Sequence, residues 1–191
     1  MKVLALVSLA SVAAGVTIRN HIEDNCRGSY LEFTNIPPRV CAVAIYENTI
    51  KGAVTVAFSG LPSFSPMYGW QARDSYTCGT IVKGDNVGPT DSKCLAKLSS
   101  SALYSGSSWS QAGLRNVKGG RDTTCTGKAA PNAIVLNDGH KYAVDNMDAE
   151  MFKSLYRMVA KGATSQELPA EYAAFEVEME TAEQRAQEIQ A

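Results

Sequence analysis

The chain has 191 residues, of which 45% are hydrophobic, and a formal net charge of −1. A nearly neutral chain of this composition can bury a core, and its charge argues against bulk binding to nucleic acid or to a membrane surface. The length suits one domain, or one domain with an appendage.

The N-terminus has the layout of a secretory signal peptide. Lys2 precedes an apolar run from Val3 to Ala14, which ends in small residues that suit cleavage near residues 14–16. That run is shorter than the roughly 20 apolar residues that a membrane-spanning helix needs. The sequence therefore predicts that residues 1–15 are a signal peptide and that the mature protein is secreted and extracellular.

Five cysteines follow the predicted signal peptide, and an oxidising compartment favours disulfide bonds between them over a metal site. The stretch CRGSYLEFTNIPPRVC, from Cys26 to Cys41, is interpreted as one covalent loop. Spacing alone leaves the pairing open; the simplest hypothesis is the local one, Cys26–Cys41 and Cys78–Cys94. Cys125 is then free, or it bonds to a second chain.

Short runs rich in β-branched and aromatic residues occupy residues 16–144, separated by turn residues. This pattern predicts strands near Ser29–Thr34, Val40–Tyr46, Ala53–Phe58, Gly69–Thr77, Thr80–Lys83, Ala102–Tyr104, Ala133–Leu136 and Lys141–Val144. Short strands at this spacing predict a mainly β domain, an antiparallel sandwich or a Greek-key barrel, held by disulfides.

His140 is a candidate catalytic residue, because Asp138 lies two positions before it and could orient it as the general base of a hydrolase. The alternative is structural. Asn137-Asp138-Gly139 between two apolar runs is a strong hairpin signal, and His140 then only begins the returning strand. The other histidine, His21, is expected in a loose N-terminal segment.

Aromatic residues in Gly- and Ser-rich surroundings could form a recognition face for sugar or protein. The candidates are Tyr68, Trp70, Tyr76 and Trp109. The alternative, favoured for the two tryptophans, is that they fill the β core.

The pattern changes at residue 145, where an acidic helical extension is predicted over residues 145–191. This segment carries a net charge of −6, against +4 for residues 16–144. A first helix is predicted from an N-cap at Asp145 or Asn146 to Gly162. A second is predicted after Pro169, since proline suits the first helical turn.

The stretch AVAIYENTIKGAVTVAFSG, within residues 42–60, resembles the start of a βγ-crystallin-type Greek key. Tyr46, Glu47, Ile50 and Gly52 carry the resemblance. It implies a Greek-key β body and no function, and the calcium-binding signature of that family is not met.

The signal segment, the CRG…PPRVC loop and the YTCGTIV…DSKC pair together resemble the small secreted cysteine-containing proteins of filamentous fungi, many of them effectors. The resemblance implies a role in interaction, virulence or competition. We therefore expect a binding protein that engages an extracellular protein or a cell-wall glycan, with no cofactor, no metal and no nucleic-acid or membrane partner. The alternatives are a small hydrolase that uses His140 with a carboxylate, and a structural protein that self-associates through Cys125.

Overall fold

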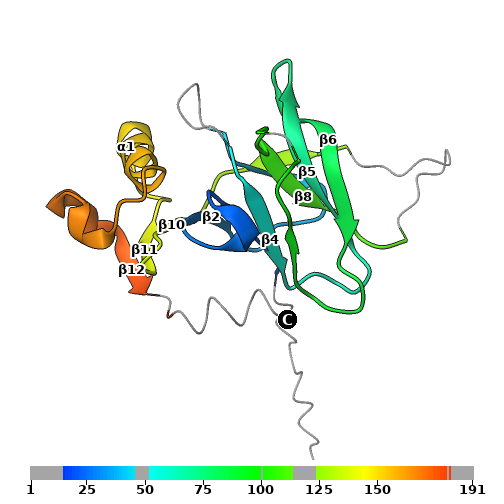
Figure 1. The fold of residues 1–191 in the computed structure, drawn as a ribbon, viewed down its shortest axis with the longest axis horizontal. Helices are drawn as coiled ribbons and strands as arrows, with labels where there is room; N and C mark the ends of the chain where they lie inside the picture. The colour runs from blue at the N-terminus through cyan, green and yellow to red at the C-terminus, as the bar shows by residue number, and fades with distance from the viewer. Residues whose placement is uncertain (1–14, 46–51, 100, 114–123, 180, 182–191) are drawn as a thin grey trace, which may run out of the picture.

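A computed structural model describes residues 15–45, 52–99, 101–113, 124–179 and 181. Two β-sheets make up most of it, and a short helical region lies beside one end of the larger sheet (Figure 1). The mainly β fold class is therefore confirmed. Residues 1–14 of the predicted signal peptide lie outside the described residues. So do Tyr46, Glu47 and Ile50, and the crystallin resemblance stays a prediction.

The larger sheet has seven antiparallel strands in the order β12-β11-β10-β2-β1-β4-β7. Its strands are β1 (Thr17–His21), β2 (Tyr30–Phe33), β4 (Thr55–Ser59), β7 (Lys93–Leu95), β10 (Ala133–Val135), β11 (His140–Ala143) and β12 (Glu176–Met179). β1 lies near the middle of this sheet, so the expectation that His21 belongs to a loose segment is wrong. His21 pairs with Tyr30 on one side and Thr55 on the other, and its side chain is buried.

The smaller sheet has five strands in the order β6-β5-β8-β3-β9, and β3 and β9 run parallel. Its strands are β3 (Val40–Val43), β5 (Pro66–Arg73), β6 (Tyr76–Asn86), β8 (Gly106–Trp109) and β9 (Gly127–Ala129). The single strand predicted over Gly69–Thr77 is wrong, because the chain turns at Asp74, where φ is 55°, and begins β6. The strand predicted at Ala102–Tyr104 forms only an isolated bridge between Ala53 and Tyr104, and β8 follows it.

The core lies between the two sheets, as in a sandwich. Alternate residues of β1 show the pattern, since Ile18 is fully buried in the apolar core while Arg19 faces outward. Asn20 is a buried polar residue in this layer. Its side-chain amide donates to the Ala42 carbonyl (3.3 Å), and its oxygen accepts from the Ser107 hydroxyl (2.8 Å). These bonds satisfy a buried amide that would otherwise cost stability, and they tie β1 to the opposite sheet.

The helical region lies at the β12–β11 end of the larger sheet. α1 (Ala149–Val159) begins at Asp148, whose carboxylate accepts from the Met151 N–H (2.8 Å), so the N-cap lies after the predicted Asp145 or Asn146. Leu155, Tyr156 and Val159 belong to the same core as the sheet residues. The second predicted helix is wrong as an α-helix. After η3 (Ser165–Glu167), the chain forms the 3₁₀ turns of η4 (Ala170–Phe175) and then β12.

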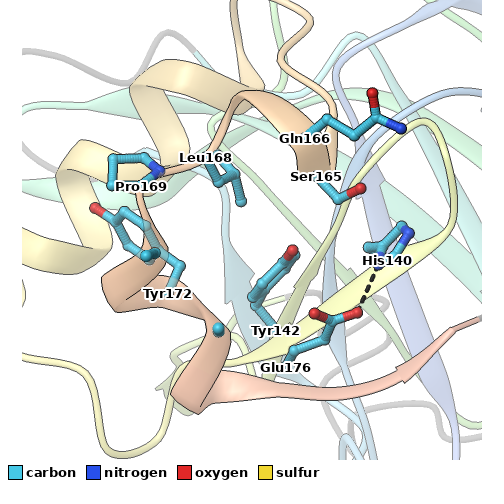
Figure 2. Close-up of a pocket in the computed structure, with 10 residues that line it drawn as sticks. His140, Tyr142, Ser165, Gln166, Leu168, Pro169, Tyr172 and Glu176 are labelled. Atoms are coloured by element: carbon cyan, nitrogen blue, oxygen red, sulfur yellow. Dashed lines mark hydrogen bonds and ion pairs between the residues drawn. The ribbon is translucent and has the colours of Figure 1, made fainter.

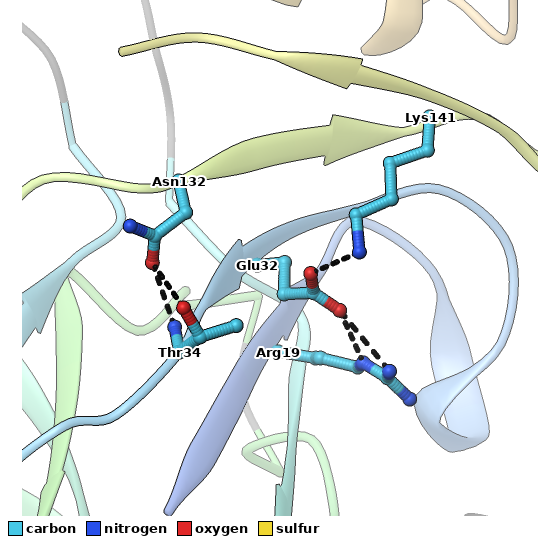
Figure 3. Close-up of polar contacts among 5 residues, drawn as sticks. All are labelled: Arg19, Glu32, Thr34, Asn132 and Lys141. Atoms are coloured by element: carbon cyan, nitrogen blue, oxygen red, sulfur yellow. Dashed lines mark hydrogen bonds and ion pairs between the residues drawn. The ribbon is translucent and has the colours of Figure 1, made fainter. Parts of the chain in front are cut away.

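Glu32 of β2 links β1 and β11 of the larger sheet (Figure 3). It lies on the opposite face of β2 from Leu31 and Phe33, which belong to the core. Its carboxylate is 3% exposed; one oxygen accepts from Arg19 of β1 (3.1 and 3.2 Å) and the other contacts Lys141 of β11 (2.5 Å). Ala133 lies opposite Glu32 on the intervening strand β10, and its small side chain leaves room for Lys141 to reach across. A buried carboxylate is tolerated here because two cations compensate its charge.

Two disulfides are present, Cys26–Cys94 and Cys41–Cys78, so the predicted local pairing is wrong although the four bonded residues are right. Cys26 lies in η1 (Asp24–Cys26), which packs on β4 and β7 of the larger sheet, whereas Cys41 lies in the smaller sheet. The bonds close separations of 68 and 37 residues, and each stabilises the fold by about 4 kcal/mol on the chain-entropy estimate.

Candidate functional site

A pocket of about 270 Å³ lies between the β11–β12 edge of the larger sheet and the η3–η4 segment (Figure 2). Its lining residues all belong to the C-terminal part of the chain. They are His140, Tyr142, Ser165, Gln166, Leu168, Pro169, Ala170, Tyr172, Ala173 and Glu176.

The β10–β11 hairpin places His140 at this pocket. Gly139 has φ of 94°, and its N–H donates to the Leu136 carbonyl (3.0 Å), which closes the turn predicted from Asn137-Asp138-Gly139. The hairpin interpretation of His140 is thus confirmed. The same turn also puts the first residue of β11 at the pocket wall, so the structural and functional interpretations are compatible.

His140 contacts Glu176, the first residue of β12, with 2.5 Å between Nδ1 and Oε1. Glu176 pairs with Tyr142 in the sheet register, so the His140 and Glu176 side chains meet diagonally across neighbouring strands. Both side chains keep some exposure to solvent. A carboxylate on Nδ1 fixes the proton there and leaves Nε2 to accept or donate a hydrogen bond.

Asp138 does not orient the His140 ring, contrary to the sequence hypothesis. Its carboxylate accepts from two backbone N–H groups, those of Ser165 (2.7 Å) and His140 (3.4 Å). Burial works in the opposite direction, but the hydrogen bonds from Ser165 and His140 hold the pKa of Asp138 below its ordinary value. Asp138 therefore fastens η3 onto the hairpin and shapes the pocket indirectly.

The opposite wall of the pocket is apolar, and a hydrogen bond to α1 fixes its position. Figure 2 shows Leu168, Pro169 and Tyr172 facing His140 and Glu176 across the pocket, with Tyr142 between them. The Tyr172 hydroxyl donates to the Met151 carbonyl of α1 (3.2 Å). Burial, with Glu176 and Asp138 nearby, raises the pKa of Tyr142 to about 12, so its hydroxyl stays neutral.

The four aromatic candidates do not gather into one recognition face. Tyr68, Trp70 and Trp109 are buried, and both indole N–H groups have partners: Ser108 for Trp70 (2.8 Å) and the Ile36 carbonyl for Trp109 (2.9 Å). Trp109 belongs to the core between the sheets, as favoured for the tryptophans, whereas Tyr68 and Trp70 are buried outside that core and contact each other with 6.3 Å between their ring centroids. Tyr76 is 66% exposed at the start of β6.

Glu176 and the apolar wall were missed because nothing local marks them. Glu176 falls within a segment that the sequence predicted as helix, and it meets His140 only because that segment pairs with β11.

Cys125 is free and half-buried, and its sulfur lies near those of Cys41 and Cys78. In the part of the chain that the structure describes, no helix is long and apolar enough to cross a membrane.

Fold and pocket together define a disulfide-linked β-sandwich with a pocket at its C-terminal end. The chain belongs to the ARB_05566 family: residues 17–132 match its N-terminal domain and residues 137–191 its C-terminal domain. It is 53% identical over 192 aligned residues, covering 100% of both chains, to a protein of the filamentous fungus Arthroderma benhamiae named "Uncharacterized secreted protein". No solved structure matches the chain.

Proposed function

We propose that this secreted protein is a binding protein, and that its His140–Glu176 pocket takes one sugar-sized unit of an extracellular glycan, on a cell wall or on a host or microbial surface. The observation that carries the proposal is the lining of the pocket. One wall offers hydrogen-bonding groups and the other offers apolar side chains.

A sugar ring has matching chemistry, with hydroxyl groups at its edge and C–H groups on its faces. His140, Gln166 and Glu176 supply donors and acceptors for hydroxyl groups, while Leu168 and Pro169, which are accessible to solvent, supply apolar surface for a ring face. Small-molecule pockets commonly measure about 300–1,000 Å³. A pocket of about 270 Å³ lies just below that range, which favours a single ring over a long segment.

The test is binding of the mature protein to a glycan array, followed by calorimetry with the glycans that bind. Gln166 is exposed at the rim and has no part in the core, so Gln166→Ala should fold normally. We expect Gln166→Ala and His140→Ala each to weaken binding about tenfold, the equivalent of one hydrogen bond of about 1.4 kcal/mol.

Tyr76→Ser is the matched control, because Tyr76 is exposed on β6 in the other sheet, and it should bind as the wild type does. Unchanged affinity in both pocket variants, or a loss of the same size in Tyr76→Ser, would contradict the proposal.

The contact between His140 and Glu176 favours a second candidate, hydrolysis of the bound glycan. A carboxylate-oriented imidazole can move a proton at Nε2 during bond cleavage. His140→Gln separates the two functions, since it keeps a hydrogen-bonding side chain but cannot act as a general base. If the protein is a hydrolase, His140→Gln should still bind the glycan but should no longer form product. If it is only a binding protein, neither the wild type nor His140→Gln should form product.

A further inference from the structure

A second group of reactive side chains lies in the N-terminal part of the chain, away from the pocket. The sulfur atoms of Cys41, Cys78 and Cys125 all lie within 4.8 Å of one another, and the first two form a disulfide. A thiol beside a disulfide is the arrangement that thiol–disulfide exchange requires.

Backbone contacts hold Cys125 in this position. The Thr126 N–H donates to the Arg39 carbonyl (2.8 Å), and the Arg39 guanidinium donates to the Thr124 carbonyl (3.2 Å). Both bonds fasten the residues around Cys125 to the segment just before β3, which carries Cys41. Cys125 itself lies outside the strands, two residues before the short edge strand β9, where a small movement disturbs little pairing.

Gly106 of β8 leaves the space that the Cys41–Cys78 disulfide occupies. A Cβ atom at Gly106 would lie 2.9 Å from the sulfur of Cys41 and 2.9 Å from that of Cys78. Only glycine therefore lets the bond between β3 and β6 pass over β8 without displacement.

We propose that Cys125 is the nucleophile of a thiol–disulfide exchange site, in which its thiolate attacks Cys41 and releases Cys78. The Cys125 thiol first loses its proton to solvent. Its sulfur then forms a bond to the Cys41 sulfur while the Cys41–Cys78 bond breaks. The electron pair of the broken bond goes to the Cys78 sulfur, which takes a proton from water, so no external oxidant or reductant is consumed.

Burial decides which sulfur leaves. Cys41 is fully buried in β3, whereas Cys78 is partly exposed at the start of β6. A thiolate released at Cys41 would have to form in an apolar interior, which disfavours charge, but at Cys78 it can be solvated. Exchange therefore presents the thiol of Cys78, in place of that of Cys125, to any thiol-reactive partner outside the cell.

The surroundings of Cys125 set the pH at which exchange is fast. Burial raises the pKa of the Cys125 thiol, and the Ser108 hydroxyl and the positive charge of Arg39 offset this only in part. Below that pKa the thiolate fraction, and with it the exchange rate, should rise about tenfold for each unit of pH. The bond is then inert in acidic surroundings and exchangeable in alkaline ones.

The variant Cys78→Ser tests the proposal, because it leaves Cys41 and Cys125 as the pair that should bond. After air oxidation of the dilute protein, titration of free thiols under denaturing conditions should detect none. The matched control Cys94→Ser leaves Cys26 and Cys125, which lie in separate places, and should retain two free thiols. Two free thiols in Cys78→Ser would overturn the proposal.

A second measurement on the wild type covers the case in which Cys78→Ser does not fold. The protein is held at pH 8.5, quenched with acid, alkylated and mapped by mass spectrometry. A peptide linked through Cys41 and Cys125, with alkylated Cys78, supports the proposal; its absence at pH 8.5, or equal amounts at pH 5 and in the alkaline sample, overturns it.

Discussion

Replacing Glu32 by Gln tests whether the buried ion network holds the larger sheet together. The substitution keeps the shape of the side chain and removes its charge, so Arg19 and Lys141 lose the carboxylate that both contact. Their side chains are only 12% and 21% exposed, and solvent replaces the lost contact poorly. The substitution should therefore lower the free energy of unfolding by more than the loss of a single surface charge would.

The expected size follows from the burial of the three groups. Removing one partner of a buried ion pair costs about 3–5 kcal/mol, and the partial exposure of the two cations places Glu32→Gln near the lower end, about 3 kcal/mol. That is a substantial part of the roughly 5–15 kcal/mol that stabilises a folded domain. For a chain of this length the melting temperature should fall by about 6–12 °C.

The assay is urea unfolding of the mature protein at neutral pH, with thermal melting as a second measure. Asp74→Asn is the matched control, since it removes a carboxylate from an exposed contact with Arg73 (3.8 Å) and should change stability by less than about 1 kcal/mol. Asparagine also tolerates the positive φ of that turn.

A double-mutant cycle with Arg19→Gln then isolates the pair. The double variant should lose less stability than the sum of the two single variants. Equal stability of Glu32→Gln and Asp74→Asn would refute the reasoning, because the network would then contribute no more than a surface contact.

Three further predictions concern stability. Gly106→Ala should destabilise the fold by about 1–3 kcal/mol in urea, because its Cβ meets both sulfurs at 2.9 Å; Gly127→Ala, whose Cβ has only Val40 within 4 Å, at 3.8 Å, is the control, and equal stability of the two variants would contradict the prediction. Asp148→Ala should cost about 1 kcal/mol through the lost N-cap of α1, and the prediction fails if unfolding monitored by circular dichroism is unchanged. Burial and the positive charge of Arg19 lower the pKa of His21 to about 3, although the hydrogen bond to the Arg27 carbonyl acts in the opposite direction. The unfolded state takes up the proton near pH 6.5, so the contribution of His21 to the free energy of unfolding is fully present above pH 6.5. As pH falls from 6.5 to about 3, this contribution is lost by about 1.4 kcal/mol per pH unit. His21→Asn should flatten the fall in stability between pH 6.5 and 4, and an unchanged slope would count against it.

Local patterns predicted the elements whose structure is decided locally. The Asn137-Asp138-Gly139 turn, the strands on either side of it and the apolar stripe of α1 needed no knowledge of distant residues. The four bonded cysteines could be predicted from the oxidising extracellular compartment and from the number of cysteines. Their pairing did not, since it depends on which strands cross, and β6 meets β3 only after the smaller sheet has formed.

The end of the chain shows the same limit most clearly. Glu176–Met179 alternates charged and apolar residues, which is compatible with a strand, yet the tyrosine and phenylalanine before it also fit a helical stripe. The choice is made by β11, which offers an unpaired edge of backbone N–H and C=O groups that a strand satisfies and a helix would leave open. The carboxylate partner of His140 arises from that choice, so it could not be identified before the sheet was known.

The two candidate sites belong to different parts of the chain, and this makes them separable by experiment. Every residue that lines the pocket lies within 137–191, the range that matches the C-terminal domain of the family, whereas all the cysteines lie within 17–132. The parts are joined through the larger sheet, where β10 pairs with both β2 and β11 and Lys141 reaches Glu32. A substitution at Cys78 should therefore leave glycan binding intact, while one at Glu32 should weaken the pocket, because Lys141, which Glu32 contacts, lies on the same strand as His140 and Tyr142.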